Sequence, residues 1–340
     1  MALNYPRLDN ASGVWNMKEV TDAVKGGYWP NAGARGLFGG GYEPSTTAVI
    51  DYITIASTGN AADFGDFTTG AGVRQGGAAA SFTRCIWGGG VVAPARRDFI
   101  DYVTFVTTGD TADFGDLTQA TGQCAAASNS TRAVFMAGKD ISPGEPNNKI
   151  DYVQMASLGN ATDFGNMTAA KAQGAAVASP TRMVHAGGIA ASPYPKINII
   201  EYITIASTGD AQDFGDLVAI NANLAGVSSS TRGAFGGGYN PTQLDTIQYI
   251  EMASTGNAID YGDLSAARDG VGSAGSNSKR GIWGGGIEPT LVDTIEYFAI
   301  PSGGAVVDFG NLTAARKDVS GNSNCHGGLN DGNQGVVDTT

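Results

Sequence analysis

RGAFGGGYNPTQLDTIQYIEMASTGNAIDYGDL, residues 232–264, is one of two long stretches of this sequence that share a pattern; the other is GLFGGGYEPSTTAVIDYITIASTGNAADFGDF, residues 36–67. Each stretch contains a glycine run, a strand-like segment with a tyrosine, and a triplet of acid, aromatic residue and glycine. The aspartate of the triplet recurs at spacings of 50, 50, 50, 47 and 48 residues, so the chain contains six copies of one unit. The six aspartates are Asp63, Asp113, Asp163, Asp213, Asp260 and Asp308.

Each unit contains four short segments separated by turn residues. In one copy these segments are NLAGVSSS (223–230), RGAFGGG (232–238), TIQYIEMAS (246–254) and AIDYGDL (258–264). Four strands in a repeat of this length are typical of a β-propeller blade, and no apolar period of 3.6 residues survives the glycines. The sequence therefore predicts an all-β fold, a six-bladed β-propeller of four-stranded blades.

The residue sizes within a unit agree with this fold. The first strand is built mainly from Ala, Gly and Ser, as the crowded centre of a propeller requires. The third strand is apolar on both faces, because Ile50 and Tyr52 point one way while Ile53 and Ile55 point the other. A blade between two neighbours needs two apolar faces, so we expect this strand to pack against both.

Closure of the ring is predicted from the order of the segments. The repeats begin in mid-blade, with the second strand at Arg35, and the last fourth strand is followed by KDVSGNSN (317–324). An open ring would leave two apolar blade faces and strand edges uncovered. We therefore expect residues 319–324 to form the innermost strand of the first blade.

Composition restricts the classes of function. The formal net charge is −12, which argues against nucleic acid and anionic membranes as partners. No apolar run approaches a membrane span, and the first ten residues do not resemble a secretory signal. The three cysteines show no CxxC pair or disulfide framework, so we expect a chain made in a cytoplasm.

The repeats resemble kelch repeats, in which a double glycine closes the second strand and a tyrosine strand follows. They are most similar to a kelch-like variant in virion proteins of tailed bacteriophages, whose repeats resemble residues 230–268, STRGAFGGGYNPTQLDTIQYIEMASTGNAIDYGDLSAAR. Such repeats often follow a short GVW…WP segment, here GVWNMKEVTDAVKGGYWP (13–30). Two departures are FMAGKD in the third copy and Gln248, which replaces the usual acid before the tyrosine.

The resemblance covers residues 35–324 and divides the chain into three parts. Residues 1–34 form an N-terminal docking segment, the propeller follows, and residues 325–340 form a C-terminal tail. The repeats lie near 35–83, 84–131, 132–181, 182–231, 232–279 and 280–324. The resemblance implies a non-enzymatic structural protein of the virion, such as a fibre, tail or surface appendage component. Implied partners are other virion proteins, further copies of this chain, and a host-surface glycan or protein; a carbohydrate-binding propeller lectin of cellular origin is the alternative.

Several chemical interpretations of the motifs are weaker than a structural one. Six DFG-like triplets without a strand lysine or an HRD loop do not indicate a kinase. Asp63 and Asp66 point to opposite faces of a strand, which disfavours calcium. The glycine runs lack a phosphate-loop lysine. His185, in an expected strand, and His326, in the tail, are the only histidines, too few for a copper site or a Ser-His-Asp set, so we expect neither a cofactor nor a metal.

An arginine precedes the second strand of each unit. There it is expected to hold carbonyl groups of a nearby turn or aspartates such as Asp63 and Asp213, while a charged ring for a partner is the alternative. The six arginines are Arg35, Arg84, Arg132, Arg182, Arg232 and Arg280.

The two faces of the ring are expected to differ. The turn face carries the turns between first and second strands and between third and fourth strands, and these repeat almost unchanged. The loop face carries the loops between second and third strands, which differ in every blade. Recognition usually resides in variable loops on a repeated scaffold, although such loops also vary where nothing constrains them. Candidate binding residues are Tyr42, Glu43, Arg96, Arg97, Tyr194, Lys196, Tyr239 and Asn240.

The N-terminal segment is predicted to contain a short helix. Asn16 and Glu19 form a possible capping box, and Gly26 and Gly27 end the pattern. A helix of this length is marginal alone, so we expect it to dock on another virion subunit or another copy; folding back on the first blade is the alternative. Candidate docking residues are Trp15, Met17, Val20, Val24, Tyr28 and Trp29.

Overall fold

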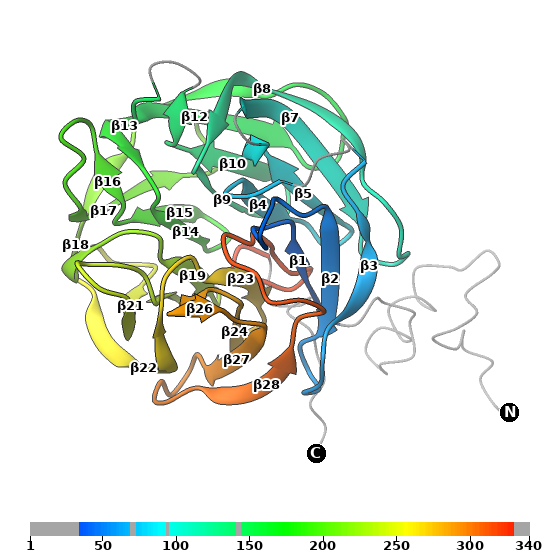
Figure 1. Cartoon of the computed structure of the whole chain (residues 1–340). Helices are drawn as coiled ribbons and strands as arrows, with labels where there is room; N and C mark the ends of the chain where they lie inside the picture. The colour runs from blue at the N-terminus through cyan, green and yellow to red at the C-terminus, as the bar shows by residue number, and fades with distance from the viewer. Residues whose placement is uncertain (1–33, 69–72, 93–94, 141–143, 330–340) are drawn as a thin grey trace, which may run out of the picture.

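The computed structural model describes residues 34–68, 73–92, 95–140 and 144–329, and they form a six-bladed β-propeller without a helix. Figure 1 views the ring roughly down its central axis, with the inner strands around the centre and the fourth strands at the rim. Blades 2–6 are antiparallel sheets whose four main strands follow one another outward in chain order, and blade 1 contains three such strands. The all-β, six-bladed prediction is therefore confirmed.

The main strands of the six blades are as follows. Blade 1 contains β1 (Arg35–Gly39), β2 (Val49–Thr54) and β3 (Ala62–Asp66). Blade 2 contains β4 (Gly77–Ala80), β5 (Arg84–Gly88), β7 (Ala95–Thr104) and β8 (Ala112–Gly122). Blade 3 contains β9 (Ala125–Ser128), β10 (Arg132–Met136), β12 (Asn147–Gln154) and β13 (Thr162–Ala172).

Blade 4 contains β14 (Ala175–Ala178), β15 (Arg182–Ala186), β17 (Ile197–Thr204) and β18 (Gln212–Asn221). Blade 5 contains β19 (Ala225–Ser228), β20 (Arg232–Gly236), β21 (Leu244–Glu251) and β22 (Ile259–Arg268). Blade 6 contains β23 (Gly272–Ser276), β24 (Arg280–Gly284), β27 (Thr294–Ala299) and β28 (Val307–Asn311).

The innermost strand of blade 1 comes from the other end of the chain. The backbone N–H groups of Leu37 and Gly39 donate to the carbonyls of Asn322 (3.1 Å) and Ser320 (2.8 Å). In return Asn324 donates to Arg35, and Gly36 and Gly39 form bridges with the same segment. This pairing is the closure that the order of the sequence segments predicts, and Figure 1 shows the orange-red end of the described chain beside β1.

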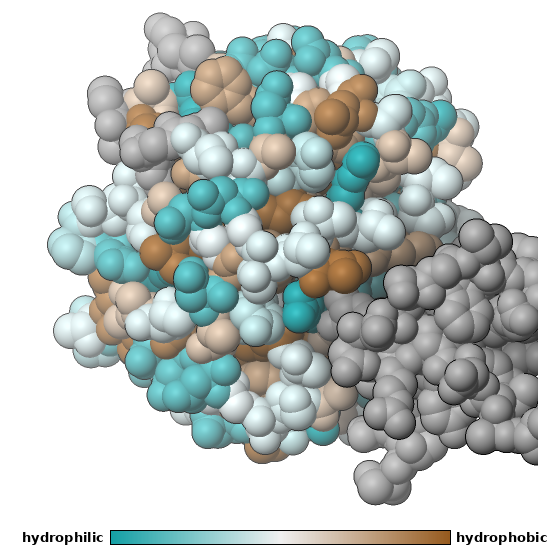
Figure 2. All heavy atoms as spheres, turned by 90° about the vertical axis from the view of Figure 1, so that its right-hand side faces the viewer, coloured by the Kyte–Doolittle hydropathy of each residue, from teal (hydrophilic) through white to brown (hydrophobic). Residues whose placement is uncertain are grey.

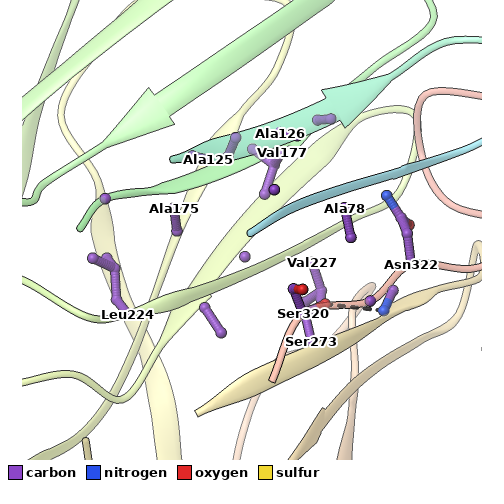
Figure 3. Close-up of a pocket in the computed structure, with 18 of the residues that line it drawn as sticks. Ala78, Ala125, Ala126, Ala175, Val177, Leu224, Val227, Ser273, Ser320 and Asn322 are labelled. Carbon is purple, nitrogen blue, oxygen red and sulfur yellow. Dashed lines mark hydrogen bonds between the residues drawn. The ribbon is translucent and has the colours of Figure 1, made fainter. Parts of the chain in front are cut away.

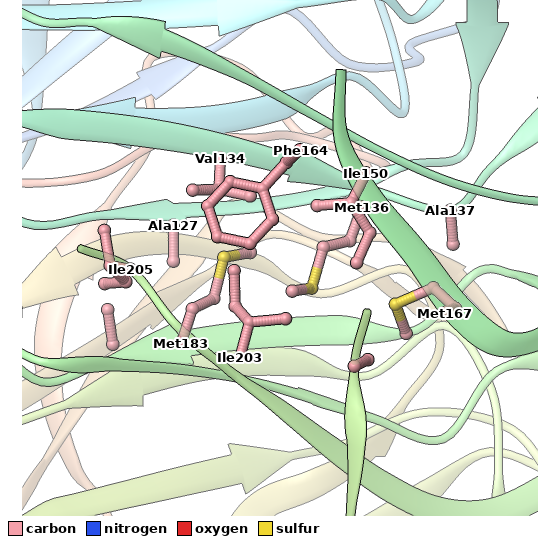
Figure 4. Packing of buried hydrophobic residues seen from close by; sticks show 12 residues of the cluster. Ala127, Val134, Met136, Ala137, Ile150, Phe164, Met167, Met183, Ile203 and Ile205 are labelled. Atoms are coloured by element: carbon pink, nitrogen blue, oxygen red, sulfur yellow. The ribbon is translucent and has the colours of Figure 1, made fainter. Parts of the chain in front are cut away.

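The hydrophobic core is divided among the blade interfaces. Six clusters of buried residues in the described part of the chain each combine side chains from two neighbouring blades. Figure 4 shows the cluster between blades 3 and 4, where Met136 and Phe164 meet Met183 and Ile203. In blade 1, Ile50 belongs to the interface with blade 2, whereas Ile53 and Ile55 belong to the interface with blade 6. The prediction of two apolar faces on the third strand is thus confirmed.

The acid-aromatic-glycine triplet forms a β-bulge between the third and fourth strands. In blade 1, Ile50 pairs with Gly65 and Asp51 pairs with Asp63, so Phe64 is the extra residue. Phe64 is buried against Tyr52 with 5.9 Å between ring centroids. Gly65 has φ +148°, and a Cβ there would lie 2.4 Å from the Gly109 carbonyl of the next blade. The triplet therefore joins neighbouring blades, as its structural interpretation predicts.

The six arginines also join neighbouring blades. The Arg132 Nη1 group donates to the Ile205 carbonyl of the next blade at 2.9 Å, and its guanidinium lies 4.8 Å from the centroid of Tyr152. Carbonyl groups, rather than the strand-start aspartates, are therefore the acceptors. The same carbonyl position accepts from Arg35, Arg84, Arg182, Arg232 and Arg280 at Phe105, Met155, Met252, Ile300 and Ile55.

Short strands on the loop face form further links that the sequence pattern did not predict. β11 (Lys139–Asp140) of blade 3 pairs with the end of β8 in blade 2, and β16 (Ile189–Ala190) of blade 4 pairs with β13 in blade 3. Isolated bridges repeat this link at the other seams, for example between Tyr239 and Ala222. Neighbouring blades therefore constrain the base of each variable loop. The remaining short strands are β6 (Val91–Val92), β25 (Ile287–Glu288) and β26 (Thr290–Leu291).

The C-terminal boundary of the ring differs from the expected division. Residues 325–329, which the sequence pattern assigns to a tail, are buried against the ring. The predicted N-terminal helix and its candidate docking residues lie outside the described residues. The described residues contain no helix capable of spanning a bilayer. On the side of the ring shown in Figure 2, hydrophobic residues lie singly among polar ones.

Candidate functional site

Two tyrosines on the loop face contact the loop of the preceding blade. Tyr194 is 40% exposed, its hydroxyl donates to Glu145 Oε1 at 2.5 Å, and Lys139 Nζ lies 4.6 Å from its ring centroid. Tyr239 is 36% exposed, with Lys196 Nζ 4.7 Å from its ring centroid. We call these five residues the tyrosine arc. The hydrogen bond to Glu145 raises the pKa of Tyr194, so this hydroxyl is a donor at neutral pH.

The other predicted loop residues occupy different environments. Tyr42 and Glu43 are half-buried, and the Arg74 guanidinium lies 5.1 Å from the Tyr42 ring centroid. Arg96 is half-buried beside Gly144. Asn240 is half-buried and its backbone N–H donates to the Thr242 carbonyl within its own loop.

Arg97, another candidate binding residue of the variable loops, is buried. It is 7% exposed, and its Nη2 group donates to Asp101 Oδ2 at 2.7 Å. Burial raises the pKa of Asp101, and the charge of Arg97 opposes that rise. Adjacent residues of an extended strand point to opposite sides, so Arg97 faces inward where Arg96 does not.

The central channel is a second site on the loop face, and the motif analysis did not identify it. One residue per blade precedes the innermost strand with a left-handed backbone, at φ between 57° and 65°. Backbone hydrogen bonds link these residues around the mouth of the channel. For example, Gln123 N–H donates to the Gln75 carbonyl, and Gln173 N–H donates to the Gln123 carbonyl. These six residues, which we call the mouth ring, are Gln75, Gln123, Gln173, Asn223, Gly270 and Asp318.

The mouth ring leads into a cavity of about 150 Å³. Figure 3 shows its wall, which includes Ala78, Ala126 and Val177 from the inner strands of three blades. The inner strands surround the axis, and their side chains are too small to fill the space between them. His326 lines the cavity at the end opposite the mouth ring.

Residues 325–329, which we call the plug, close the channel on the turn face. His326 Nε2 donates to the Ala80 carbonyl at 2.8 Å, while Nδ1 accepts from Gly328 N–H at 3.1 Å. Burial lowers the pKa of His326 to about 4. A Cβ at Gly328 would lie 1.7 Å from the Ser128 carbonyl, so only glycine fits this close approach. The channel is therefore a blind pocket that opens on the loop face.

Serine side chains link the inner strands beside the plug. Ser128 Oγ donates to the Ala80 carbonyl at 2.7 Å and accepts from Ala80 N–H at 2.9 Å. Each hydroxyl thus pairs with backbone groups at the inner edge of the preceding blade, where no further strand follows. The same donation to the preceding blade recurs at Ser228, Ser276 and Ser323.

The acid before the strand tyrosine has a structural role that the sequence analysis left unassigned. Glu201 of blade 4 is 1% exposed and pairs with Lys171 of blade 3 at 2.7 Å. At the corresponding seam Gln248 instead accepts from Val218 N–H at 2.7 Å, which accounts for the departure from the acid pattern. Its sequence signal was a polar residue between buried neighbours in a strand. The charged pair recurs as Asp51–Arg316 and Glu296–Arg268.

The remaining titratable groups of interest are buried. His185 lies in β15 as predicted and is 1% exposed, and neither ring nitrogen has a hydrogen-bond partner. Burial, reinforced by the charge of Lys171, lowers its pKa to about 3. Burial raises the pKa of Cys124 to about 11 and of Cys325 to about 12, and it raises the pKa of Cys85 as well. Among the described residues no group of His, Cys, Asp and Glu is arranged to hold a metal ion.

Comparison with protein-family models and with curated proteins gives no match. The class of protein is therefore defined by the fold, a six-bladed β-propeller with a blind central channel. Its loop face combines the tyrosine arc with the mouth ring, and these are the candidate binding surfaces.

Proposed function

We propose that this chain is a non-enzymatic structural protein of a bacteriophage virion, a kelch-like propeller that presents its loop face to a protein or host receptor. The observation that carries the proposal is the difference between the faces. The repeated arginines and most turn Asp and Asn side chains of the turn face bond within the ring, whereas the loop face exposes aromatic and charged side chains that differ from blade to blade. The virion assignment follows from the resemblance of the repeats.

The contacts on the turn face support this orientation. Its arginines donate to carbonyls of the next blade, and its turn residues cap the fourth strand of the preceding blade, as Asp110 Oδ1 does by accepting from Asp66 N–H at 3.0 Å. Groups with such contacts have less capacity for a partner. On the loop face, Tyr194 and Tyr239 provide large rigid rings, which are frequent anchors of protein interfaces.

The state of the histidines and cysteines supports a non-enzymatic role. Both histidines are buried with lowered pKa values, and the three cysteines are buried with raised pKa values. A histidine general base would need a pKa near neutrality, and a thiolate nucleophile would need a lowered pKa. Neither residue type is poised for catalysis here.

The partners follow from the same proposal. Other virion proteins hold the ring through residues 1–34, further copies of this chain surround it in the particle, and the loop face stays available. A host-surface glycan or protein is the partner of that face. The chain is made in the host cytoplasm and ends in the virion.

The first test is the presence of this chain in purified phage particles, measured by mass spectrometry. We then compare particles carrying Tyr194→Ala with Tyr239→Ala against wild-type particles for adsorption to host cells. Leu158→Ala, a 53% exposed residue of a turn, is the matched control. We expect normal incorporation of all variants and reduced adsorption of the loop-face variant alone. Absence from particles, with glycan-array binding by the ring, would instead favour the cellular lectin.

A further inference from the structure

The three consecutive side chains Gln123, Gln173 and Asn223 of the mouth ring have unused hydrogen-bonding groups. They line the cavity from blades 3, 4 and 5, and they make no side-chain hydrogen bond within the described part of the chain. Gln123 Oε1 is buried and without a partner. A buried polar atom without a partner destabilises a fold, so it points to a ligand or water that supplies the bond.

The left-handed backbone at these positions favours glycine, so the presence of glutamine there needs an explanation. Gln123 has φ +60° and Gln173 has φ +61°, a conformation that costs roughly 1–2 kcal/mol for a residue with a Cβ. Gly270 occupies the same position in blade 6 with φ +65°. The ring therefore accepts glycine there, and the fold alone does not require a long amide side chain. Strain retained at a pocket is a reason to look for a function of the strained residue.

The remaining members of the ring limit the charge of a ligand. Asp318 supplies its only carboxylate, which lies 4.0 Å from Arg74 Nη1 and interacts with the Gln75 side chain. A Cβ at Gly270 would lie 2.9 Å from Asp318 Oδ1, so the carboxylate occupies the gap that this glycine leaves. One carboxylate already beside a guanidinium is a poor cation site, and the three amides carry no charge for an anion.

The depth and walls of the cavity fit a compact polyol. Three residues beyond Gln123 and Gln173, the wall consists of Ala126 and Ala176, whose methyl groups offer an apolar surface. A cavity of about 150 Å³ holds roughly ten water molecules, because one water needs on the order of 10–15 Å³. Side-chain amides donate and accept hydrogen bonds at once, which matches neighbouring hydroxyl groups on one ring.

We propose that the blind central channel binds a neutral sugar ring, held by the amides of Gln123, Gln173 and Asn223 against the alanine wall. The sugar is either a free monosaccharide or the end of a glycan chain, since both present the same hydroxyl groups. This site is separate from the tyrosine arc and does not depend on the virion assignment.

The test uses the full chain and isothermal titration calorimetry. The probes are glucose, galactose and mannose, their methyl glycosides, and calcium chloride and sodium phosphate as ions. We expect saturable binding of at least one sugar and no binding of either ion. Retained binding of the methyl glycoside identifies a glycan end, whereas binding of the free sugar alone identifies a monosaccharide.

The deciding variant is Gln123→Gly with Gln173→Gly, which removes two amides and relieves the backbone strain. We expect the affinity for the sugar to fall roughly tenfold or more while the melting temperature stays equal or rises. Tyr239→Ala is the control and should bind as wild type does. Asn223→Gly provides the same comparison if the double variant does not fold. Absence of saturable sugar binding, binding of an ion in its place, or unchanged affinity in the glycine variants would overturn the proposal.

Discussion

The turn face and the loop face of this ring are built from the same six repeats, yet their side chains serve different purposes. On the turn face, each blade uses an arginine against its strand tyrosine and the carbonyl of the next blade, and five of the six described turns use an Asp or Asn side chain to cap the preceding blade. On the loop face, backbone bridges join the blades, so the side chains are free to differ. The comparison teaches that a repeated residue in this chain indicates an interblade contact, whereas a non-repeated residue indicates a candidate binding surface.

The closing segment should have the largest effect on stability. Truncation after Thr313 removes the inner strand of blade 1, the plug, and Arg316, whose Nη2 group lies 2.9 Å from Asp51 Oδ2 with both side chains fully buried. Loss of one member of a buried pair costs about 3–5 kcal/mol, before the lost strand is counted. We expect no cooperative thermal transition by circular dichroism. Truncation after Leu329, which keeps all described contacts, should melt as the full chain does; equal melting of both truncations would contradict closure.

The charged seam between blades 3 and 4 should be the next most sensitive. Glu201→Gln leaves Lys171 buried without a counter-charge and should lower the free energy of unfolding by about 3–5 kcal/mol. Adding Lys171→Asn copies the neutral seam, where Asn221 and Gln248 occupy these positions. We expect the double variant to recover at least half of the loss in chemical denaturation. Additive losses would show that the two residues are not coupled.

Acid should destabilise the ring through its buried histidines. The folded pKa values of His185 and His326 lie below the ordinary 6.5, at about 3 and about 4, so the unfolded chain binds more protons below pH 6.5. The stability that the neutral histidines contribute is therefore present above about pH 6.5 and is lost as the pH drops towards 4, by roughly 3 kcal/mol for His326 from its shift. His185→Leu should flatten part of this fall and raise stability at neutral pH. A pH profile identical to wild type would contradict this assignment.

The smallest expected losses of stability come from a direct comparison of one arginine on the turn face with one lysine on the loop face. Arg132→Met removes the bond to the Ile205 carbonyl and the contact with Tyr152, and it should cost about 2 kcal/mol. Lys196→Met removes only a surface contact with Tyr239, so we expect a change below about 0.5 kcal/mol. Both values come from denaturant titrations. Equal losses would mean that the loop face also contributes structural side-chain contacts.

The sequence predicted only part of the candidate site, because the rest depends on contacts between blades. The tyrosine arc includes Tyr194, Lys196 and Tyr239, which the variable loops predicted, but Lys139 and Glu145 become their partners only when neighbouring blades meet. Arg97 illustrates the opposite case, since its loop position made it a candidate binding residue, whereas strand alternation buries it. The mouth ring was missed because its glutamines are separated by about 50 residues and resemble ordinary polar connections.

The sequence by itself determined the number of blades, the four strands of each blade and the closing segment, because spacing and residue size are local properties that repeat six times. Only the tertiary structure decided which side chains meet across the seams and around the axis. It placed the triplet aromatic in a bulge, paired Glu201 with Lys171, and buried His326 in the channel. These contacts join residues of different blades, and their geometry depends on how the twisted sheets pack around one axis rather than on any single repeat.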